Sequence, residues 1–205
     1  MSPVTSDLPS VVNAAATQRK LKSRLDLHER GWAFWELRNI NMHRVVGLFR
    51  PDGPIVDVGT LNTTLRDALA RNFKRAWWRG IAYGVVADAG AFSPAPDDLK
   101  VLVDSYENTK GTMQWVVLVD ASSRKVTGVH NWIEGYLGPV YRAVLQSLAS
   151  QGYQISSIMK DKDGLLRFLT AVADARSEVL TGRPTFPEFQ DPFARPGNNS
   201  STRSR

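Results

Sequence analysis

The stretch FKRAWWRG, residues 73–80, places two adjacent tryptophans among basic side chains. Lysine and arginine neutralise phosphate groups, and an exposed indole ring can stack on an unpaired base. This combination is typical of a surface that binds a single strand or a nucleic-acid backbone. The structural alternative is a buried tryptophan flanked by arginines, because one of two adjacent rings that enter a strand must point inward.

A second basic group, in residues 19–24, precedes this stretch. We expect both groups to lie on one face and to bind nucleic acid, either DNA or a single strand. The predicted contact residues are Arg19, Lys20, Lys22, Arg24, Arg71, Lys74, Arg75, Trp77, Trp78 and Arg79.

The charge distribution favours a directed basic surface. Residues 1–80 contain 13 Lys/Arg against 7 Asp/Glu, whereas residues 81–205 contain 13 of each. The whole net charge of +6 therefore comes from the first part of the chain. A basic region next to a neutral remainder is typical of a protein that attracts a polyanion, although basic excess also serves solubility.

Candidates for acid–base chemistry are few. The three histidines are far apart in the sequence, with no second ligand at metal-binding spacing, so we predict no metal site. His130 is the best acid–base candidate, because a hairpin end that faces a helix start can bring it near Glu134 and Asp120. No Walker A loop, dinucleotide fingerprint or nucleophile elbow is present, and the sequence specifies no cofactor.

The composition indicates where the protein works. There are no cysteines, which excludes disulfides and thiolate chemistry and fits a reducing compartment. We predict no signal peptide and no membrane span, because the longest apolar stretch is interrupted by Arg79 and Asp88 and is shorter than the roughly 20 residues a spanning helix needs. A cytoplasmic protein is expected. Its oligomeric state is not indicated.

The residue patterns predict the elements that position these groups. Leu21, Leu25, His28, Trp32 and Trp35 recur at helical spacing and predict a helix over residues 17–39. Apolar runs around Pro51-Asp52-Gly53 predict a hairpin within residues 43–57. A helix over 60–76 and a strand over 80–89 follow. Further along we expect a helix over 94–109, a hairpin over 114–132, a helix over 139–151, a strand over 153–159 and a last helix over 165–182.

These elements predict an α+β fold with about six strands in a mixed sheet and about five helices. Residues 43–89 and 114–160 are interpreted as two copies of one ββαβ unit. Residues 17–183 would form one domain. Residues 1–16 and 184–205, which are rich in small and polar residues, are predicted to be flexible ends.

The segment IVDVGTLNTTLRDALARNFKRAWWRGIAYGVVAD, residues 55–88, resembles the core of the ParB/sulfiredoxin-like superfamily. The shared features are a strand that ends in an acid and a glycine, a helix that opens at that glycine, and a following strand. The resemblance assigns Asp57 and Gly59 to the motif at the helix N-terminus, where backbone N–H groups favour phosphate. It implies a nuclease or nucleotide-hydrolysing activity of a type associated with plasmid-borne interference proteins. The family's motif arginine is absent, because Asn62 occupies its place and Arg66 follows one turn later.

Two other functions fit the same residues. A protein-interaction module, such as an inhibitor or an assembly factor, would use Trp32, Trp35, Trp77 and Trp78 with neighbouring arginines as a hot spot. Attachment of the first helix to anionic lipid is the third alternative, although Asp26 and Glu29 on its polar face disfavour it. Nucleic-acid binding through residues 17–80 is the leading prediction.

Overall fold

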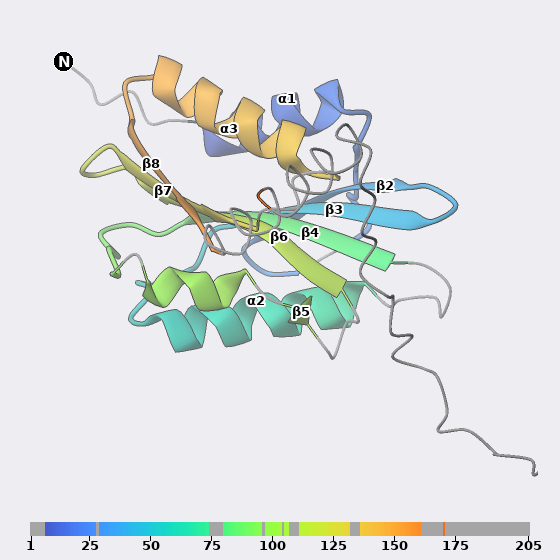
Figure 1. The fold of residues 1–205 in the computed structure, drawn as a ribbon, viewed down its shortest axis with the longest axis horizontal. Helices are drawn as coiled ribbons and strands as arrows, with labels where there is room; N and C mark the ends of the chain where they lie inside the picture. The colour runs from blue at the N-terminus through green and yellow to red at the C-terminus, as the bar shows by residue number, and fades with distance from the viewer. Residues whose placement is uncertain are drawn as a thin grey trace, which may run out of the picture. The chain divides into compact units, whose positions relative to one another are not determined.

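A twisted mixed β-sheet with helices on both faces makes up most of what the computed structural model describes (Figure 1). The described residues are 7–27, 29–73, 80–95, 97–103, 105–106, 111–131, 136–160 and 170. All of them except residue 170 belong to the unit Met1–Lys162, and residue 170 belongs to a second unit, Asp163–Arg205.

The sheet has eight strands in this described part. The strands are β1 (Lys22–Ser23), β2 (Trp32–Arg38), β3 (Met42–Phe49), β4 (Gly80–Asp88), β5 (Ser105–Tyr106), β6 (Gly111–Asp120), β7 (Lys125–His130) and β8 (Gln154–Met159). Their order is β1-β2-β3-β4-β6-β7-β8, and β5 pairs with β6. β3, β4 and β6 are parallel to one another, whereas β2 and β7 run antiparallel to their hairpin partners β3 and β6.

Three α-helices cover the sheet in the described residues: α1 (Leu8–Gln18), α2 (Val58–Asn72) and α3 (Gly138–Ser150). Helix α2 joins the parallel pair β3–β4, and α3 joins the parallel pair β7–β8. Both connections step across the sheet in the same direction, but β7 and β8 run opposite to β3 and β4. Right-handed crossovers therefore require the two helices to lie on opposite faces. Figure 1 shows this arrangement, with α1 and α3 on one face and α2 on the other.

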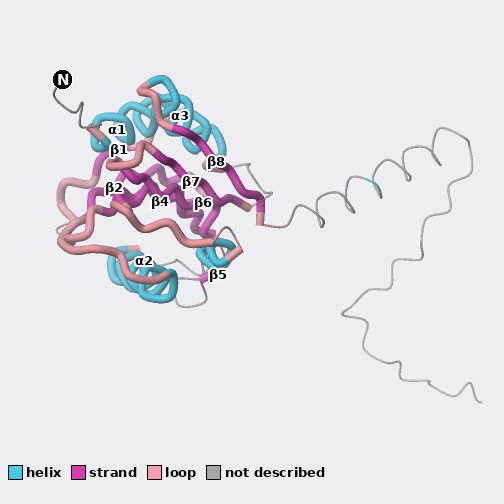
Figure 2. The backbone as a smooth tube through the Cα atoms, turned by 90° about the vertical axis from the view of Figure 1, so that its left-hand side faces the viewer, coloured by secondary structure: helices cyan, strands magenta, loops and turns pink. Residues whose placement is uncertain are grey.

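Each face of the sheet has its own hydrophobic core. Figure 2 shows the sheet between the helices that cover its two faces. On one face, α1 and α3 pack on alternate residues of the central strands, including Val46, Val86 and Trp115. On the other face, α2 and the 3₁₀ helix η1 (Asp98–Leu102) pack on the intervening residues, including Val45 and Val85. Because both faces are covered, the central strands β4 and β6 are apolar along nearly their whole length.

The prediction of about five helices is wrong, although the fold is α+β and its sheet is mixed as expected. The predicted helix over residues 17–39 is instead the end of α1 followed by β1 and β2. Its apparent stripe arises by coincidence, because Leu25 is 85% exposed and Gly31 has a φ of 75° that ends any regular helix. The first hairpin is β2–β3, and residues 50–57 form a loop that leads to α2.

The predicted helix over residues 94–109 is also wrong, because the described residues of this range form the short 3₁₀ helix η1 and then the strand β5. The order strand–strand–helix–strand occurs twice, as β2–β3–α2–β4 and β6–β7–α3–β8. The first of these units begins at Trp32, eleven residues before the predicted start at 43. The predicted last helix over 165–182 lies outside the described residues, apart from residue 170.

Helix α1 occupies much of the segment that was predicted to be a flexible N-terminus. Its buried residues are Leu8, Val11, Val12, Ala15 and Ala16, which join the core beside α3. Asp7 caps its first turn by accepting hydrogen bonds from Ser10. None of the helices in the described ranges has the length and apolar character needed to cross a bilayer.

Candidate nucleic-acid interface

The β2–β3 hairpin ends in a two-residue turn at the edge of the sheet where β3, β4 and β6 begin, which we call the amino edge. The turn is closed by the N–H of Asn39, which donates to the carbonyl of Met42 over 2.9 Å. Ile40, in the turn, is 81% exposed. The hairpin projects at the right-hand side of Figure 1, next to the start of β4. The N–H of Gly80 donates to the carbonyl of Asn41, with 3.3 Å between the two atoms.

A hollow of about 600 Å³ lies against this turn. We call it the hairpin pocket, and it is lined by Arg38, Asn39, Ile40, Asn41, Met42, Arg44 and Tyr136. The guanidinium of Arg44 lies over the ring of Tyr136, with Cζ 5.6 Å from the ring centre. The Nε atom of Arg44 is buried and has no hydrogen-bond partner in the described part of the chain. The pocket therefore combines an aromatic ring, two cations and two amides.

Glu36 holds the cationic wall of the pocket in place. Its side chain is only 12% exposed, and it contacts three groups at once. Its Oε1 lies 2.6 Å from Arg24 and 3.2 Å from Nε of Arg38, while Oε2 lies 2.7 Å from Nε2 of His43. Burial by itself raises the pKa of Glu36, but the hydrogen bonds from His43 and Arg24 outweigh it and hold the pKa below its usual value. Glu36 is therefore a fixed negative charge that orients Arg38.

The basic residues predicted near the N-terminus fall into two groups. Arg19, Lys20 and Lys22 are exposed in the turn after α1 and on the edge strand β1, and they form no ion pair within the described residues. Arg24 is neutralised, because Asp26 and Glu36 each bind it at 2.6 Å. The first three cations remain available to a polyanion, and Arg24 does not.

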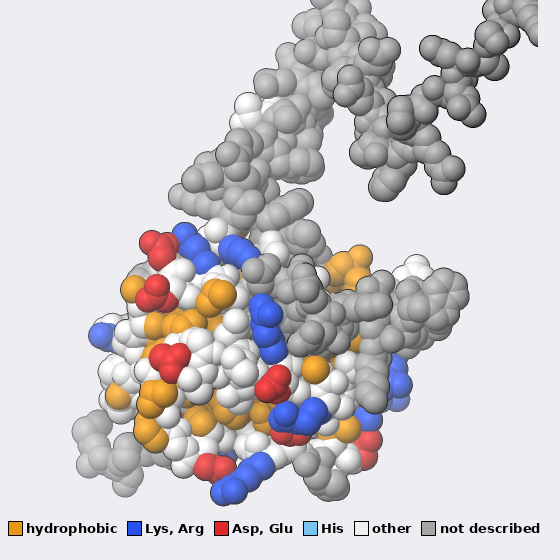
Figure 3. All heavy atoms as spheres, turned by 90° about the horizontal axis from the view of Figure 1, so that it is seen from below, with side chains coloured by type: hydrophobic (Ala, Val, Ile, Leu, Met, Phe, Trp, Pro, Cys, Tyr) orange, Lys and Arg blue, Asp and Glu red, His pale blue; other side chains and the backbone are white. Residues whose placement is uncertain are grey.

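Arg71 is predicted to contact nucleic acid, but in the structure it forms an ion pair with Glu29. It lies near the end of α2, on the other face of the sheet, and its guanidinium binds Glu29 at 2.6 Å. The space-filling view of that face shows acidic and basic side chains interspersed among the coloured residues, with no continuous patch of one sign (Figure 3). The α2 face is therefore a poor match for a polyanion.

Five of the predicted contact residues lie outside the described residues: Lys74, Arg75, Trp77, Trp78 and Arg79. The residues on either side of this segment are described. Phe73 packs edge-on against Phe34 and His43, at centroid distances of 5.1 and 5.6 Å. Gly80 is bonded to the hairpin turn. Phe73 and Gly80, the described neighbours of this segment, therefore both contact the β2–β3 hairpin.

Two of the tryptophans of the protein-interaction alternative, Trp32 and Trp35, pack against the cores of the sheet. Trp35 is buried, and its Nε1 donates to Asn13 over 2.9 Å. Trp32 is partly exposed and stacks on Phe34 and Phe49, at 5.1 and 4.9 Å. These two rings stabilise the hairpin and its neighbours.

The catalytic candidates are not brought together among the described residues. Asp57 caps α2, and its two carboxylate oxygens accept from the amide and hydroxyl of Thr60 at 2.8 and 2.6 Å. Arg66 lies on α2, where its Nε contacts Asn62 at 3.3 Å. His130 ends β7 and packs beside Tyr141, on the α3 face. Glu134 lies outside the described residues.

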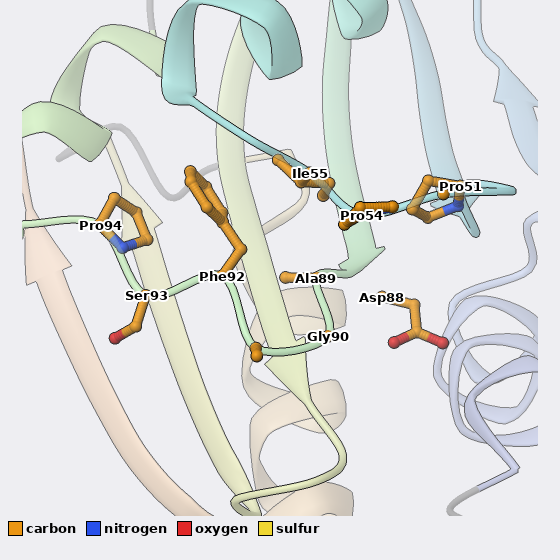
Figure 4. Close-up of a pocket in the computed structure, with 11 residues that line it drawn as sticks. Pro51, Pro54, Ile55, Asp88, Ala89, Gly90, Phe92, Ser93 and Pro94 are labelled. Carbon is orange, nitrogen blue, oxygen red and sulfur yellow. The ribbon is translucent and has the colours of Figure 1, made fainter.

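The opposite edge of the sheet, where β3, β4 and β6 end, holds a second pocket of about 480 Å³. Loops 51–55 and 88–94 form its walls. In Figure 4 the ring of Phe92 points toward Ile55, whereas the carboxylate of Asp88 points away from it. The lining contains no lysine, arginine or histidine, and no group of three metal-ligating side chains occurs within the described ranges. This pocket therefore lacks the charge that a phosphate group requires.

Comparison of the chain with protein-family models, curated proteins and solved structures gives no match. The resemblance of residues 55–88 to the ParB/sulfiredoxin-like core stays an expectation from the sequence. In the structure residues 54–57 form a loop outside the sheet, and Asp57 serves as the N-cap of α2.

Several residues of the hairpin pocket were not singled out from the sequence. Arg38, Arg44 and Tyr136 come from β2, β3 and the turn before α3. The available signal is the pair Asn39 and Asn41 between two largely apolar strands, because asparagine is typical of a hairpin turn.

Proposed function

We propose that this protein binds nucleic acid through the amino edge of its sheet. The observation that carries the proposal is the hairpin pocket, in which Arg38 and Arg44 stand beside an aromatic ring. The bond between Gly80 and Asn41 connects that pocket directly to the segment 74–79, which contributes three more basic residues and two tryptophans to the chain at this point.

The charge distribution supports the same surface. Residues 19–44 carry seven Lys/Arg against three Asp/Glu. Arg19, Lys20 and Lys22 belong to this range and form no ion pair within the described residues, so they can neutralise phosphates without first breaking an internal contact. Contacts of this kind release counterions and make the affinity fall as salt rises. A cytoplasmic location, expected from the cysteine-free sequence, agrees with such a partner.

The proposal is tested with labelled single-stranded and duplex DNA at about 50 and about 200 mM salt. In the site variant, Arg19, Lys22 and Arg38 are replaced by glutamine. The control variant carries the same charge change at Arg30, Lys100 and Lys125, away from the hairpin pocket. Circular dichroism and thermal unfolding verify that both variants fold.

We expect the affinity of the unmodified protein to fall steeply with salt. The site variant should bind about tenfold more weakly than the control variant at the lower salt. An affinity that is insensitive to salt, or an equal loss in both variants, would contradict the proposal. Complete absence of binding would favour the protein-interaction alternative, which a pull-down after nuclease treatment then examines.

A further inference from the structure

We propose further that the hairpin pocket binds an unpaired nucleobase, so that the preferred partner is single-stranded nucleic acid. This inference rests on the proposed function and names the form of nucleic acid that the same site selects. It follows from the size of the pocket, its exposed ring and the amides of Asn39 and Asn41.

The pocket has the dimensions and surfaces that a flat heterocycle requires. Its volume of about 600 Å³ lies within the range of sites that enclose small ligands. The ring of Tyr136 is 41% exposed even though the guanidinium of Arg44 lies over it. Ile40 and Met42 supply apolar walls. A base can stack on such a ring only when its own face is free, which is the case in a single strand.

The polar groups of the pocket fit the edge of a base. The amides of Asn39 and Asn41, both exposed, carry donors and acceptors for the Watson–Crick edge. In a duplex that edge is already paired, so these groups would remain unused.

The phosphate contacts of a single strand fit the surroundings of the pocket. Arg38, which is 53% exposed, is oriented by Glu36 at the rim. Arg19, Lys20 and Lys22, which form no ion pair within the described residues, lie on the adjoining edge strand and the turn before it. A backbone that passes over this edge can meet positive charge at the rim of the pocket and along β1.

The experiment compares three DNA ligands with the same number of phosphates: a single strand, the same strand with its bases removed, and a shorter duplex. The unmodified protein should bind the normal strand about tenfold more tightly than the abasic strand and the duplex. An RNA strand of the same sequence is measured in parallel. Tighter binding of the DNA strand or of the RNA strand than of the abasic strand supports base binding in the hairpin pocket.

Two substitutions of Tyr136 distinguish the effect of losing the aromatic ring from the effect of losing the fold. Tyr136→Leu should weaken binding of the normal strand about tenfold and leave binding of the abasic strand unchanged. Tyr136→Phe keeps the ring and should bind within about twofold of the unmodified protein. Should Tyr136→Leu fail to fold, the comparison of normal and abasic strands on the unmodified protein still decides.

Equal affinity for the normal and abasic strands would overturn the inference, as would tighter binding of the duplex. The latter result would indicate that Ile40 enters a groove of paired DNA instead. In both cases salt-dependent binding that is lost in the site variant would leave the proposed function intact. Failure of every ligand to bind would instead contradict the proposed function itself.

Discussion

The N–H of Gly80 donates a hydrogen bond to the carbonyl of Asn41, with nitrogen and oxygen 3.3 Å apart. Gly80 opens β4 and directly follows segment 74–79, whereas Asn41 lies in the β2–β3 turn. The bond therefore holds Gly80 beside the turn that lines the hairpin pocket. The proposed nucleic-acid surface depends on this contact between residues that helix α2 separates in the sequence.

Replacing Glu36 with glutamine should destabilise the protein by about 1–3 kcal/mol, because a mostly buried carboxylate then no longer balances Arg24 and Arg38. Urea unfolding at neutral pH measures the change. The matched control is Asp52→Asn, which removes an exposed carboxylate paired with the exposed Arg30 and should change the stability by less than about 0.5 kcal/mol. Equal effects of the two substitutions would contradict the central role of Glu36.

Comparison of the unmodified protein with Glu36→Gln also gives a prediction of how stability depends on pH. The pKa of Glu36 is lower in the folded protein than in the unfolded chain, so its stabilising effect is complete above the ordinary glutamate pKa of about 4.3. The effect is lost as the pH falls through the lower, folded value. The stability difference between unmodified protein and Glu36→Gln should therefore shrink below about pH 4. A difference that grows on acidification would be inconsistent with the lowered pKa.

Gly84→Ala should destabilise the protein by about 1–3 kcal/mol through overpacking. A Cβ at this position of β4 would lie 2.3 Å from the indole of Trp115, which is fully buried and cannot move aside freely. Trp115 also donates from Nε1 to the carbonyl of Leu137, so its displacement would disturb the start of α3 beside Tyr136. Denaturant unfolding measures the loss.

Gly53→Ala is the control for this substitution. Gly53 lies in the loop after β3, and a Cβ there would meet no atom within 4 Å. We expect its stability to stay within about 0.5 kcal/mol of the unmodified protein. Comparable losses for Gly84→Ala and Gly53→Ala would contradict the indole contact as the cause of the effect.

Asp57→Ala should lower the melting temperature, whereas Asp57→Asn should retain most of it. The Asp57 side chain accepts from the amide of Thr60 at the start of α2, and asparagine can do the same. Hydrogen bonds from the Thr60 side chain and amide hold the pKa of Asp57 below its usual range. Its contribution is therefore present at neutral pH and lost on strong acidification. An unchanged melting temperature in Asp57→Ala would contradict the capping role of Asp57.

Arg71→Gln should leave oligonucleotide affinity within about twofold of the unmodified protein, because Glu29 already neutralises Arg71 on the α2 face. Arg38→Gln removes the same charge at the pocket rim and should weaken binding several-fold. Fluorescence anisotropy at low salt measures both. A larger loss in Arg71→Gln than in Arg38→Gln would move the interface to the α2 face.

Much of the fold follows from local patterns. The helical stripe of Leu61, Leu65 and Leu69 predicts α2, and all three side chains are buried as expected. The apolar runs on either side of residues 121–124 predict the hairpin β6–β7, and the run after Gly152 predicts β8. Such elements are predictable because their own sequence supplies both the periodicity and the turn that ends it.

Other elements were mispredicted because a local pattern competed with the tertiary structure. The sequence around Trp32 and Trp35 fits a helical stripe, but in the structure the two residues lie on opposite faces of β2. Pairing with β3 over seven residues decides this outcome, and a helix could not provide it. Gly31 permits it, since a side chain there would collide with the carbonyl of Arg50, at 2.4 Å.

The sequence by itself determined the α+β class, the uneven charge and the central strands, because these depend on composition and on short-range patterns. It did not determine the hairpin pocket, since Arg44 and Tyr136 are far apart in the chain and meet only when α3 packs across the sheet. It also could not separate the available cations from the paired ones. That distinction depends on where Glu29 and Glu36 lie, and only long-range strand pairing and helix packing place them.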